Sequence, residues 1–221
     1  MSDLTPDRIA LGLTSYVVLL FSLSFHESAH AWMASRLGDD TARSLGRVSL
    51  NPIVHIDLFG TLIFPLLQIF TGVPLLGWAK PTPYNPANFR PDVSQRKGHM
   101  LVAAAGPVSN LILALVFTAI LYVLIRTGVV DGTRQTLPTI VILGIELNVL
   151  LAVFNFVPIP PLDGAKVASF GLPASVGERY DRVVGPYGFM ILMLLMFTGA
   201  LSRVLGPIQG FILGLLAWLV R

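Results

Sequence analysis

Long apolar stretches separated by short polar ones dominate the pattern along this chain. Five stretches carry at most one formal charge each and are at least 17 residues long: 9–35, 99–125, 135–162, 183–202 and 204–220. Crossing the hydrocarbon layer takes about 20 apolar residues, and about 17 is the lower limit. Helices satisfy their own backbone hydrogen bonds in lipid. The pattern therefore predicts an all-α polytopic membrane protein with five transmembrane helices.

A sixth apolar stretch, residues 58–79, is harder to interpret. It contains Pro65, Gly72, Pro74 and Gly77, and such a density of helix breakers argues against an ordinary span. It is either a sixth span or a re-entrant segment. If it is re-entrant, 11 of the 15 Lys and Arg residues share one side of the membrane, and if it spans only 9 do. The positive-inside rule favours the re-entrant segment, with the N-terminus outside and the basic side cytoplasmic.

Composition supports the membrane assignment and excludes several functions. Hydrophobic residues make up 54% of the chain and charged residues 12%, against about 25% charged in soluble domains. The net charge of +3 comes from dispersed basic residues, so we expect no nucleic-acid binding. The chain has no cysteine, which excludes disulfides and thiolate metal ligands. Asp3 and Asp7 stand where a signal peptide is basic, so we expect the first apolar segment to be retained.

Titratable groups occur inside the first apolar stretch, in the sequence SFHESAHAWMA. His26, Glu27 and His30 form the pattern H-E-x-x-H, which places both imidazoles on one helix face, one turn apart. Two such histidines can bind one zinc ion, while the glutamate acts as general base toward a metal-activated water. The pattern also occurs by chance in soluble helices. Ionisable residues within a membrane helix are costly and usually mark a functional site, which favours the metal site here.

A zinc site needs a third protein ligand, and the polar candidates at membrane depth are His55, Asp57, His99, Glu146 and Asp163. Asp163 follows Pro158, Pro160 and Pro161, so it lies on interrupted backbone beyond the third predicted span. Such backbone is tolerated at this depth only inside protein or beside a watery cavity. With five spans, Asp163 emerges on the same side as the two histidines. An alternative is that Asp163 only caps the next helix.

These motifs resemble the site-2 protease family, zinc metalloproteases that cut substrates within the membrane. The resemblance rests on His26-Glu27-x-x-His30, on Asn155-x-x-Pro158 with Leu162-Asp163-Gly164, and on AAAGPVSN at residues 103–110. NPIVHIDLFGTLIFPLL and GWAKPTPYNPANF are similar to the segment between the first two core helices of short family members. The resemblance covers about residues 15–170, and no segment is long and polar enough for the PDZ or CBS domain of many relatives.

The resemblance implies one zinc ion per chain, bound by His26, His30 and Asp163, with Glu27 activating water. It also implies that Asn155 and Asn110 contact the substrate carbonyl or its oxyanion, although asparagines in membrane bundles commonly bond helix to helix instead. The expected fold is a three-helix catalytic core. Short membrane-associated β-strands, in 44–56 or 78–90, would pair with an extended substrate.

We therefore expect one membrane-embedded metalloprotease domain over residues 1–221, with a catalytic core at about 9–170 and C-terminal helices at about 183–220. The expected substrate is a single-pass membrane protein, and the expected location is a prokaryotic cell membrane, with the active site nearer the cytoplasm. The alternative is a non-catalytic protein or a metal-ion transporter that uses the same ligands. The sequence leaves open the oligomeric state, the regulatory signal and the roles of Glu146, His55 and Asp57; a structural role is favoured for Glu146, and a surface or gating role for the other two.

Overall fold

The computed structural model describes residues 5–71, 77–129 and 136–221. Gly72 and Pro74 of the ambiguous apolar stretch, and Gln135 at the start of the third one, lie outside the described residues. The α-helices are α1 (Pro6–Arg36), α2 (Thr41–Ser44), α3 (Phe64–Thr71), α4 (Gln95–Arg126), α5 (Thr136–Asn155), α6 (Asp163–Gly171), α7 (Ala174–Val184), α8 (Gly188–Phe197) and α9 (Ala200–Leu219). Short 3₁₀ turns occupy Pro52–His55, Pro86–Asn88 and Gly185–Tyr187, and Leu58–Ile63 forms a π-helix.

Five helical segments among the described residues are long and apolar enough to cross a membrane, as the sequence predicted. They are Pro6–Arg36, Gln95–Arg126, Thr136–Asn155, Ala174–Phe197 and Ala200–Leu219. Local signals set their starts. The Thr5 hydroxyl accepts a hydrogen bond from the Arg8 amide at the start of α1, and Ser94 does the same for Lys97 at the start of α4. The chain is an integral, multi-pass membrane protein.

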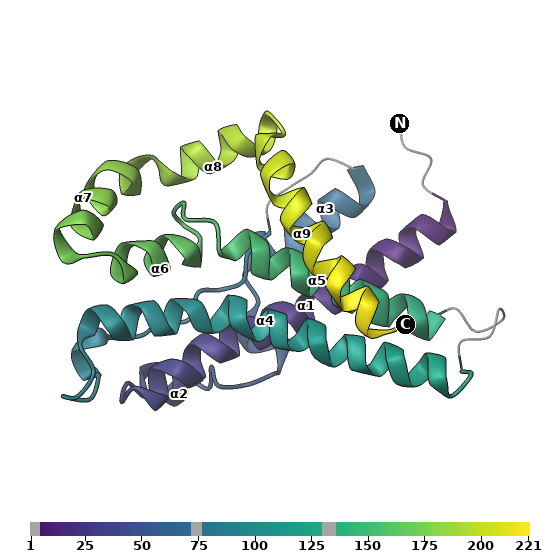
Figure 1. Ribbon diagram of the computed structural model, residues 1–221, viewed down its shortest axis with the longest axis horizontal. Helices are drawn as coiled ribbons and strands as arrows, with labels where there is room; N and C mark the ends of the chain where they lie inside the picture. Colours follow the sequence, from purple (N-terminus) through teal and green to yellow (C-terminus); the bar gives the residue numbers. More distant parts are fainter. Residues whose placement is uncertain (1–4, 72–76, 130–135) are drawn as a thin grey trace.

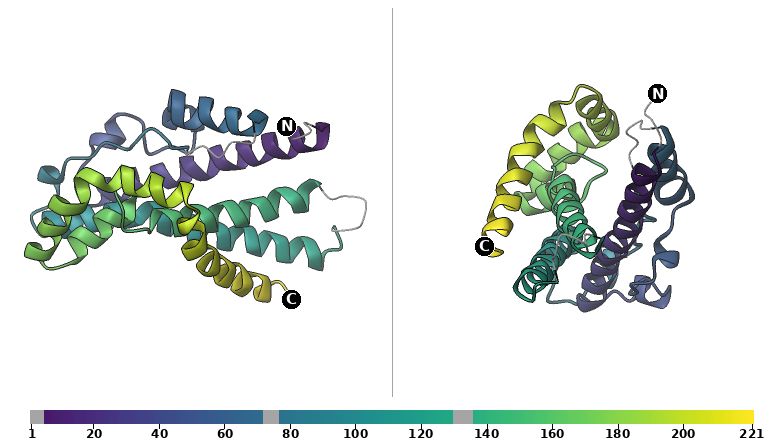
Figure 2. Two further views of the ribbon diagram at one scale, coloured as in Figure 1. Left: turned by 90° about the horizontal axis from the view of Figure 1, so that it is seen from above. Right: turned by 90° about the vertical axis from the view of Figure 1, so that its right-hand side faces the viewer.

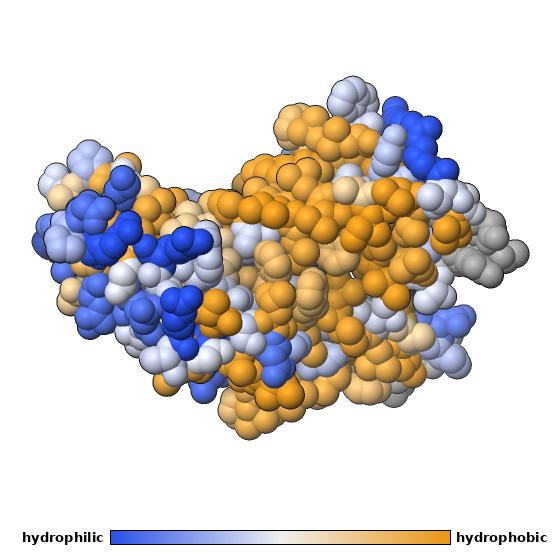
Figure 3. All heavy atoms as spheres, turned by 90° about the horizontal axis from the view of Figure 1, so that it is seen from below, coloured by the Kyte–Doolittle hydropathy of each residue, from blue (hydrophilic) through white to orange (hydrophobic). Residues whose placement is uncertain are grey.

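Helices α1, α4 and α5 pack together in the middle of the molecule, and α6 packs against α4 (Figures 1 and 2). Small residues allow the close approach: a Cβ added to Gly144 of α5 would stand 2.8 Å from the ring of Phe117 of α4. Hydrophilic side chains gather at the end of the molecule that carries α2 and α7, and a broad apolar band covers much of the rest of the face in Figure 3.

The segment Leu58–Thr71 packs along the N-terminal half of α1. The Tyr16 hydroxyl donates to the Thr61 carbonyl at 2.9 Å, and Gly12 lies against Ile69. This helical segment is about 20 Å long at 1.5 Å per residue, which is too short to cross about 30 Å of hydrocarbon.

The predicted short β-strands are wrong for the part of the chain that the structure describes, which contains no strand. Residues 77–85 are extended but make only isolated backbone pairs: the Lys80 amide donates to the His55 carbonyl at 2.9 Å, and Trp78 to Gly60 at 3.1 Å. Pro52, Pro81 and Pro83 have no amide hydrogen, so a continuous ladder of hydrogen bonds cannot form here.

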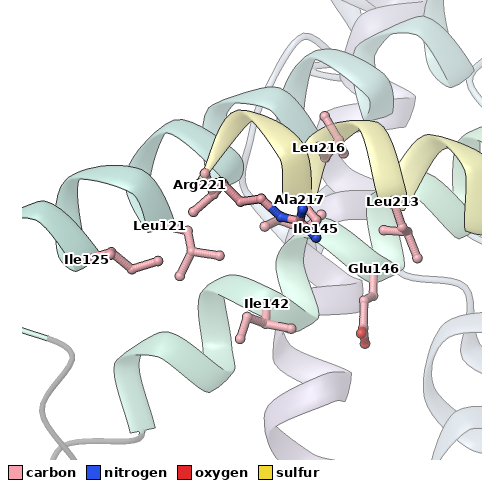
Figure 4. A pocket seen from close by; sticks show the side chains of 10 residues that line it. Leu121, Ile125, Ile142, Ile145, Glu146, Leu213, Leu216, Ala217 and Arg221 are labelled. Atoms are coloured by element: carbon pink, nitrogen blue, oxygen red, sulfur yellow. The ribbon is translucent and has the colours of Figure 1, made fainter.

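The C-terminal helices differ from the expected up-and-down arrangement. Gly199, at a φ of 69°, separates α8 from α9, and α9 then continues toward the far ends of α4 and α5 rather than turning back (Figures 1 and 2). Arg221 accordingly lines a hollow together with Ile125 of α4 and Ile142 of α5 (Figure 4). Five alternating spans would put Arg221 on the opposite side of the membrane from Arg126, among the 11 basic residues counted on one side. Arg221 instead lies beside Ile125, the neighbour of Arg126, so ten basic residues stay on that side.

Candidate metal centre

The H-E-x-x-H residues lie in the C-terminal half of α1, and the two histidines face the helices that pack against it. His26 and His30 are buried, with exposed fractions of 4% and 7%. Their Nε2 atoms lie 3.0 Å apart, and the two rings meet edge to face. A helix turn therefore brings the two imidazoles to one point, as their spacing predicted.

Asp163 reaches the same point from a distant part of the sequence. Its Oδ2 atom lies 3.1 Å from Nε2 of His26 and 3.2 Å from Nε2 of His30. The chain turns between α5 and α6, and Gly164 packs so closely on this turn that a Cβ would stand 2.5 Å from the Val157 carbonyl oxygen. Leu162 is the N-cap of α6, and no side chain caps that helix. The carboxylate of Asp163 thus points at the histidines instead of capping its own helix.

Hydrogen bonds behind the rings determine which nitrogens carry protons. Nδ1 of His26 lies 2.6 Å from Oδ1 of Asn110, and Nδ1 of His30 lies 2.7 Å from the Val102 carbonyl oxygen. Both oxygens only accept: the Asn110 orientation follows from its Nδ2, which donates to Oδ1 of Asn148 at 2.8 Å. Both Nδ1 atoms therefore carry hydrogens, so in the neutral imidazoles both Nε2 atoms are acceptors.

This assignment tests whether a metal fits the site. With neutral imidazoles, two Nε2 lone pairs and one carboxylate oxygen converge within 3.0–3.2 Å. Three acceptors at this spacing repel one another unless a cation lies between them. Tetrahedral zinc with ligands at 2.0–2.1 Å holds those ligands about 3.3 Å apart, and it prefers nitrogen and oxygen donors in catalytic sites. The residues present fit zinc.

Glu27 completes the cluster from the same helix. A ligand atom from each of His26, Glu27 and His30 lies within 4.8 Å of the others. The carboxylate is held from outside α1: Oε2 accepts from the Thr82 amide at 3.0 Å and from the Thr82 hydroxyl at 2.8 Å. The structure thus adds a residue that the sequence analysis missed.

These groups line a cavity of about 410 Å³ between α1, α4, α5, α6 and residues 77–84. Tyr84 lies on its wall, where burial and the negative charge of Asp163 raise its pKa to about 12, so the phenol stays neutral. Its hydroxyl is paired with Nδ1 of His99 at 2.9 Å. Lys166, one turn beyond Asp163, also lines the cavity and lies over the ring of Tyr84.

The two predicted asparagines lie in different places. Asn155 lines the cavity, and its Nδ2 donates to the Leu151 carbonyl of its own helix. Asn110 is fully buried behind His26, and its Nδ2 lies within bonding distance of Asn148 and of the Ser22 carbonyl. Its amide faces α5 and α1, and the substrate contact predicted for it stays a prediction.

The remaining polar candidates lie away from the cluster. Asp57 caps the π-helix by accepting from the amides of Phe59 and Gly60, and His55 Nε2 is paired with the Ser49 carbonyl. Glu146 lies on α5 beside the separate hollow between α4, α5 and α9 (Figure 4).

A buried two-histidine, one-aspartate set beside a glutamate, within helices of membrane length, defines a membrane-embedded metalloprotein. Comparison with known proteins gives its family. Residues 14–144 match the profile described as peptidase family M50. The chain is 38% identical over 201 residues to the candidate zinc metalloprotease YwhC of Bacillus subtilis, covering 89% of this chain and 87% of that protein.

Two further relatives are longer than this chain. The candidate zinc metalloprotease Rip2 of Mycolicibacterium smegmatis is 31% identical, over 83% of this chain and 66% of its own length. The candidate zinc metalloprotease Rip3 of Mycobacterium tuberculosis is 29% identical, over 95% of this chain and 44% of its own length. No solved structure gives a significant match. The chain belongs to peptidase family M50, the site-2 protease family, and is a zinc metalloendopeptidase.

Proposed function

We propose that this protein is an intramembrane zinc endopeptidase that hydrolyses peptide bonds in the transmembrane segments of membrane-protein substrates. One observation carries the proposal: three acceptor atoms of His26, His30 and Asp163 converge next to Glu27 in a cavity between helices of membrane length. A non-catalytic member would have no need of Glu27 at this place, and a transporter would need ligands at successive depths.

Each residue then has a definite task. His26, His30 and Asp163 hold one zinc ion, which supplies Lewis acidity that polarises a peptide carbonyl and lowers the pKa of a water to about 7. Glu27 accepts the proton of the attacking water and returns it to the leaving amine. Asn155 donates to the substrate carbonyl or its oxyanion from the cavity wall. We assign Asn110 to orienting His26 in place of a substrate contact.

Helices α1, α4 and α5 form the three-helix catalytic core in this proposal: α1 and the adjoining α6 supply the cluster, α4 supports it through Asn110, and α5 lines the cavity with Asn155. The domain assignment of the sequence analysis follows: one membrane-embedded domain, with a core at about 9–170 and C-terminal helices at about 183–220.

Residues 58–79 form a re-entrant segment in this proposal. Their two ends lie side by side, as the backbone bonds Lys80–His55 and Trp78–Gly60 indicate, so the chain enters and leaves on the same side. This side holds most basic residues, which makes it cytoplasmic and puts the N-terminus outside. Because His26 and His30 lie in the half of α1 that leads to this side, the zinc cluster lies nearer the cytoplasm of a prokaryotic cell.

The proposal is tested by Glu27→Gln in the purified, detergent-solubilised protein. The variant keeps the size of the side chain and leaves the zinc ligands in place, so we expect about one zinc per chain and a loss of cleavage of a single-pass membrane substrate by a factor of about 10² to 10⁴. His26→Ala is the matched comparison and should lose zinc as well. Full activity of Glu27→Gln would overturn the proposal.

A further inference from the structure

Thr82 donates both hydrogen bonds that the Glu27 carboxylate accepts from the described residues, and both reach the same carboxylate oxygen. The amide N–H and the hydroxyl of Thr82 donate to Oε2 at 3.0 and 2.8 Å, and the same hydroxyl lies 3.0 Å from the Glu27 main-chain carbonyl oxygen. Among the described residues, no hydrogen bond occupies Oε1. One oxygen of the carboxylate is therefore held, and the other is left for chemistry in the cavity.

The sequence around Thr82 makes this contact specific. Lys80-Pro81-Thr82-Pro83-Tyr84 places Thr82 between two prolines, which lack amide hydrogens. Thr82 is thus the single main-chain donor of residues 81–83. The residue before a proline is restricted to extended conformations, which applies to both Lys80 and Thr82. A register shift by one residue would put a proline opposite Glu27 and remove the bond.

The strap formed by residues 78–85 is anchored on both sides of Thr82. On one side, the Lys80 amide donates to the His55 carbonyl at 2.9 Å, and Trp78 donates to Gly60. On the other side, the Asn85 amide donates at 2.7 Å to Oδ2 of Asp39, a fully buried carboxylate. Along 81–85 the side chains alternate between exposed and half-buried, and Thr82 and Tyr84 are the half-buried ones on the cavity wall.

We propose that Thr82 is a positioning residue for the general base: the strap holds Glu27 by Oε2 in the one rotamer that presents Oε1 to the reacting water. A glutamate side chain has three rotatable bonds, so a free carboxylate would populate many positions, whereas catalysis requires the base within about 0.5 Å of the productive geometry. This inference rests on the proposed function and adds a residue to it.

The test uses Thr82→Val, which keeps the β-branched shape and the amide N–H but removes the hydroxyl. We expect kcat for a membrane-embedded substrate to fall about 10-fold, a fraction of the full general-base effect, with KM changed less than about twofold. Zinc content and the thermal unfolding temperature should be unchanged, since Thr82 contacts no zinc ligand. Thr82→Ser restores the hydroxyl and should restore kcat.

Two controls separate positioning from general damage. Thr118→Val removes another buried hydroxyl, which donates to the Ala114 carbonyl of its own helix, and should leave kcat unchanged. In a Glu27→Gln background, Thr82→Val should cause no further loss, because residues that act as a unit are not additive.

Unchanged or increased kcat in Thr82→Val, while Glu27→Gln is inactive, would overturn the positioning role and leave the protease assignment standing. Zinc loss in Thr82→Val would also overturn it, since the threonine would then support the metal site. Activity of Glu27→Gln would instead overturn the proposed function itself.

Discussion

Asn110 and His26 form the shortest link between the metal cluster and the core of the helix bundle, with Oδ1 of Asn110 2.6 Å from Nδ1 of His26. Asn110 in turn donates to Asn148, whose Nδ2 donates to the Ser22 hydroxyl at 2.9 Å. Helices α1, α4 and α5 are thereby connected by one buried polar network. This network favours the tautomer of His26 that carries its hydrogen on Nδ1, so that the Nε2 lone pair can bind a metal ion.

Asn110→Leu should therefore weaken zinc binding. The substitution keeps a side chain of similar size but removes the acceptor of the His26 Nδ1 hydrogen, and loss of such outer partners costs about 10- to 100-fold in metal affinity. The measurement is zinc retention against a graded series of chelator concentrations. Asn148→Leu, one bond further from His26, should weaken zinc binding less, and equal zinc retention in Asn110→Leu and the unmodified protein would contradict the assignment.

Gly106 of α4 leaves the space that the two imidazoles occupy. A Cβ at this position would stand 2.6 Å from Nε2 of His26 and closer still to Nε2 of His30. Gly106→Ala should displace the ligands and abolish stoichiometric zinc binding, although alanine is otherwise favoured over glycine in a helix by about 1 kcal/mol.

The matched control is Gly210→Ala in α9, where an added Cβ meets nothing within 4 Å. That variant should keep its zinc and unfold at the same or a slightly higher temperature. Zinc content by mass spectrometry and thermal unfolding in detergent give both answers, and a Gly106→Ala protein with one zinc per chain would contradict the expected clash.

Asp39 should make the stability of the strap depend on pH. Burial raises the pKa of this carboxyl, but hydrogen bonds from Thr41, Asn88 and Asn85 outweigh burial and hold the pKa below its ordinary value of 3.8. A depressed folded-state pKa stabilises the protein above about pH 4, and this contribution is lost as pH falls through the lower folded value. Thermal unfolding between pH 5 and pH 3 measures the effect.

Asp39→Asn provides the comparison for that titration. The amide cannot ionise and cannot accept all of the same hydrogen bonds, so the variant should be less stable than the unmodified protein at pH 7. Its unfolding temperature should also change less between pH 5 and pH 3. Parallel curves for the two proteins would show that Asp39 does not carry the pH dependence.

The sequence allowed prediction of those parts that depend on spacing and solvent. The apolar stretches gave the five candidate spans because lipid imposes a length, and H-E-x-x-H gave the cluster because a helix turn imposes a direction. Asp163 was found through broken backbone at membrane depth, 133 residues after His30, and the structure brings its Oδ2 to within 3.2 Å of both imidazoles.

The parts that failed depend on packing across the bundle. The apolar pattern does not mark whether α9 turns back after Gly199, since it predicts an apolar helix of the same length in either direction. A strand near 78–90 would need an amide donor at every ladder position, and Pro81 and Pro83 have no amide hydrogen. Thr82 could have been suspected from the same count, as the lone donor between two prolines. Asn110 has the residue type of both a substrate contact and a helix linker, and only its position behind His26 distinguishes them.

Asp163→Asn separates the ligand role of Asp163 from the capping alternative. Asn and Asp are equally good N-caps, so a capping residue would tolerate the change, whereas a metal ligand loses the negatively charged carboxylate oxygen that zinc prefers and keeps only a neutral amide oxygen. We expect Asp163→Asn to lose at least about 100-fold in zinc affinity while α6 stays folded. Asp57→Asn is the matched control, because Asp57 caps the π-helix and contacts neither histidine, and it should retain full zinc binding. Stoichiometric, chelator-resistant zinc in Asp163→Asn would mean that the two histidines bind the metal without it.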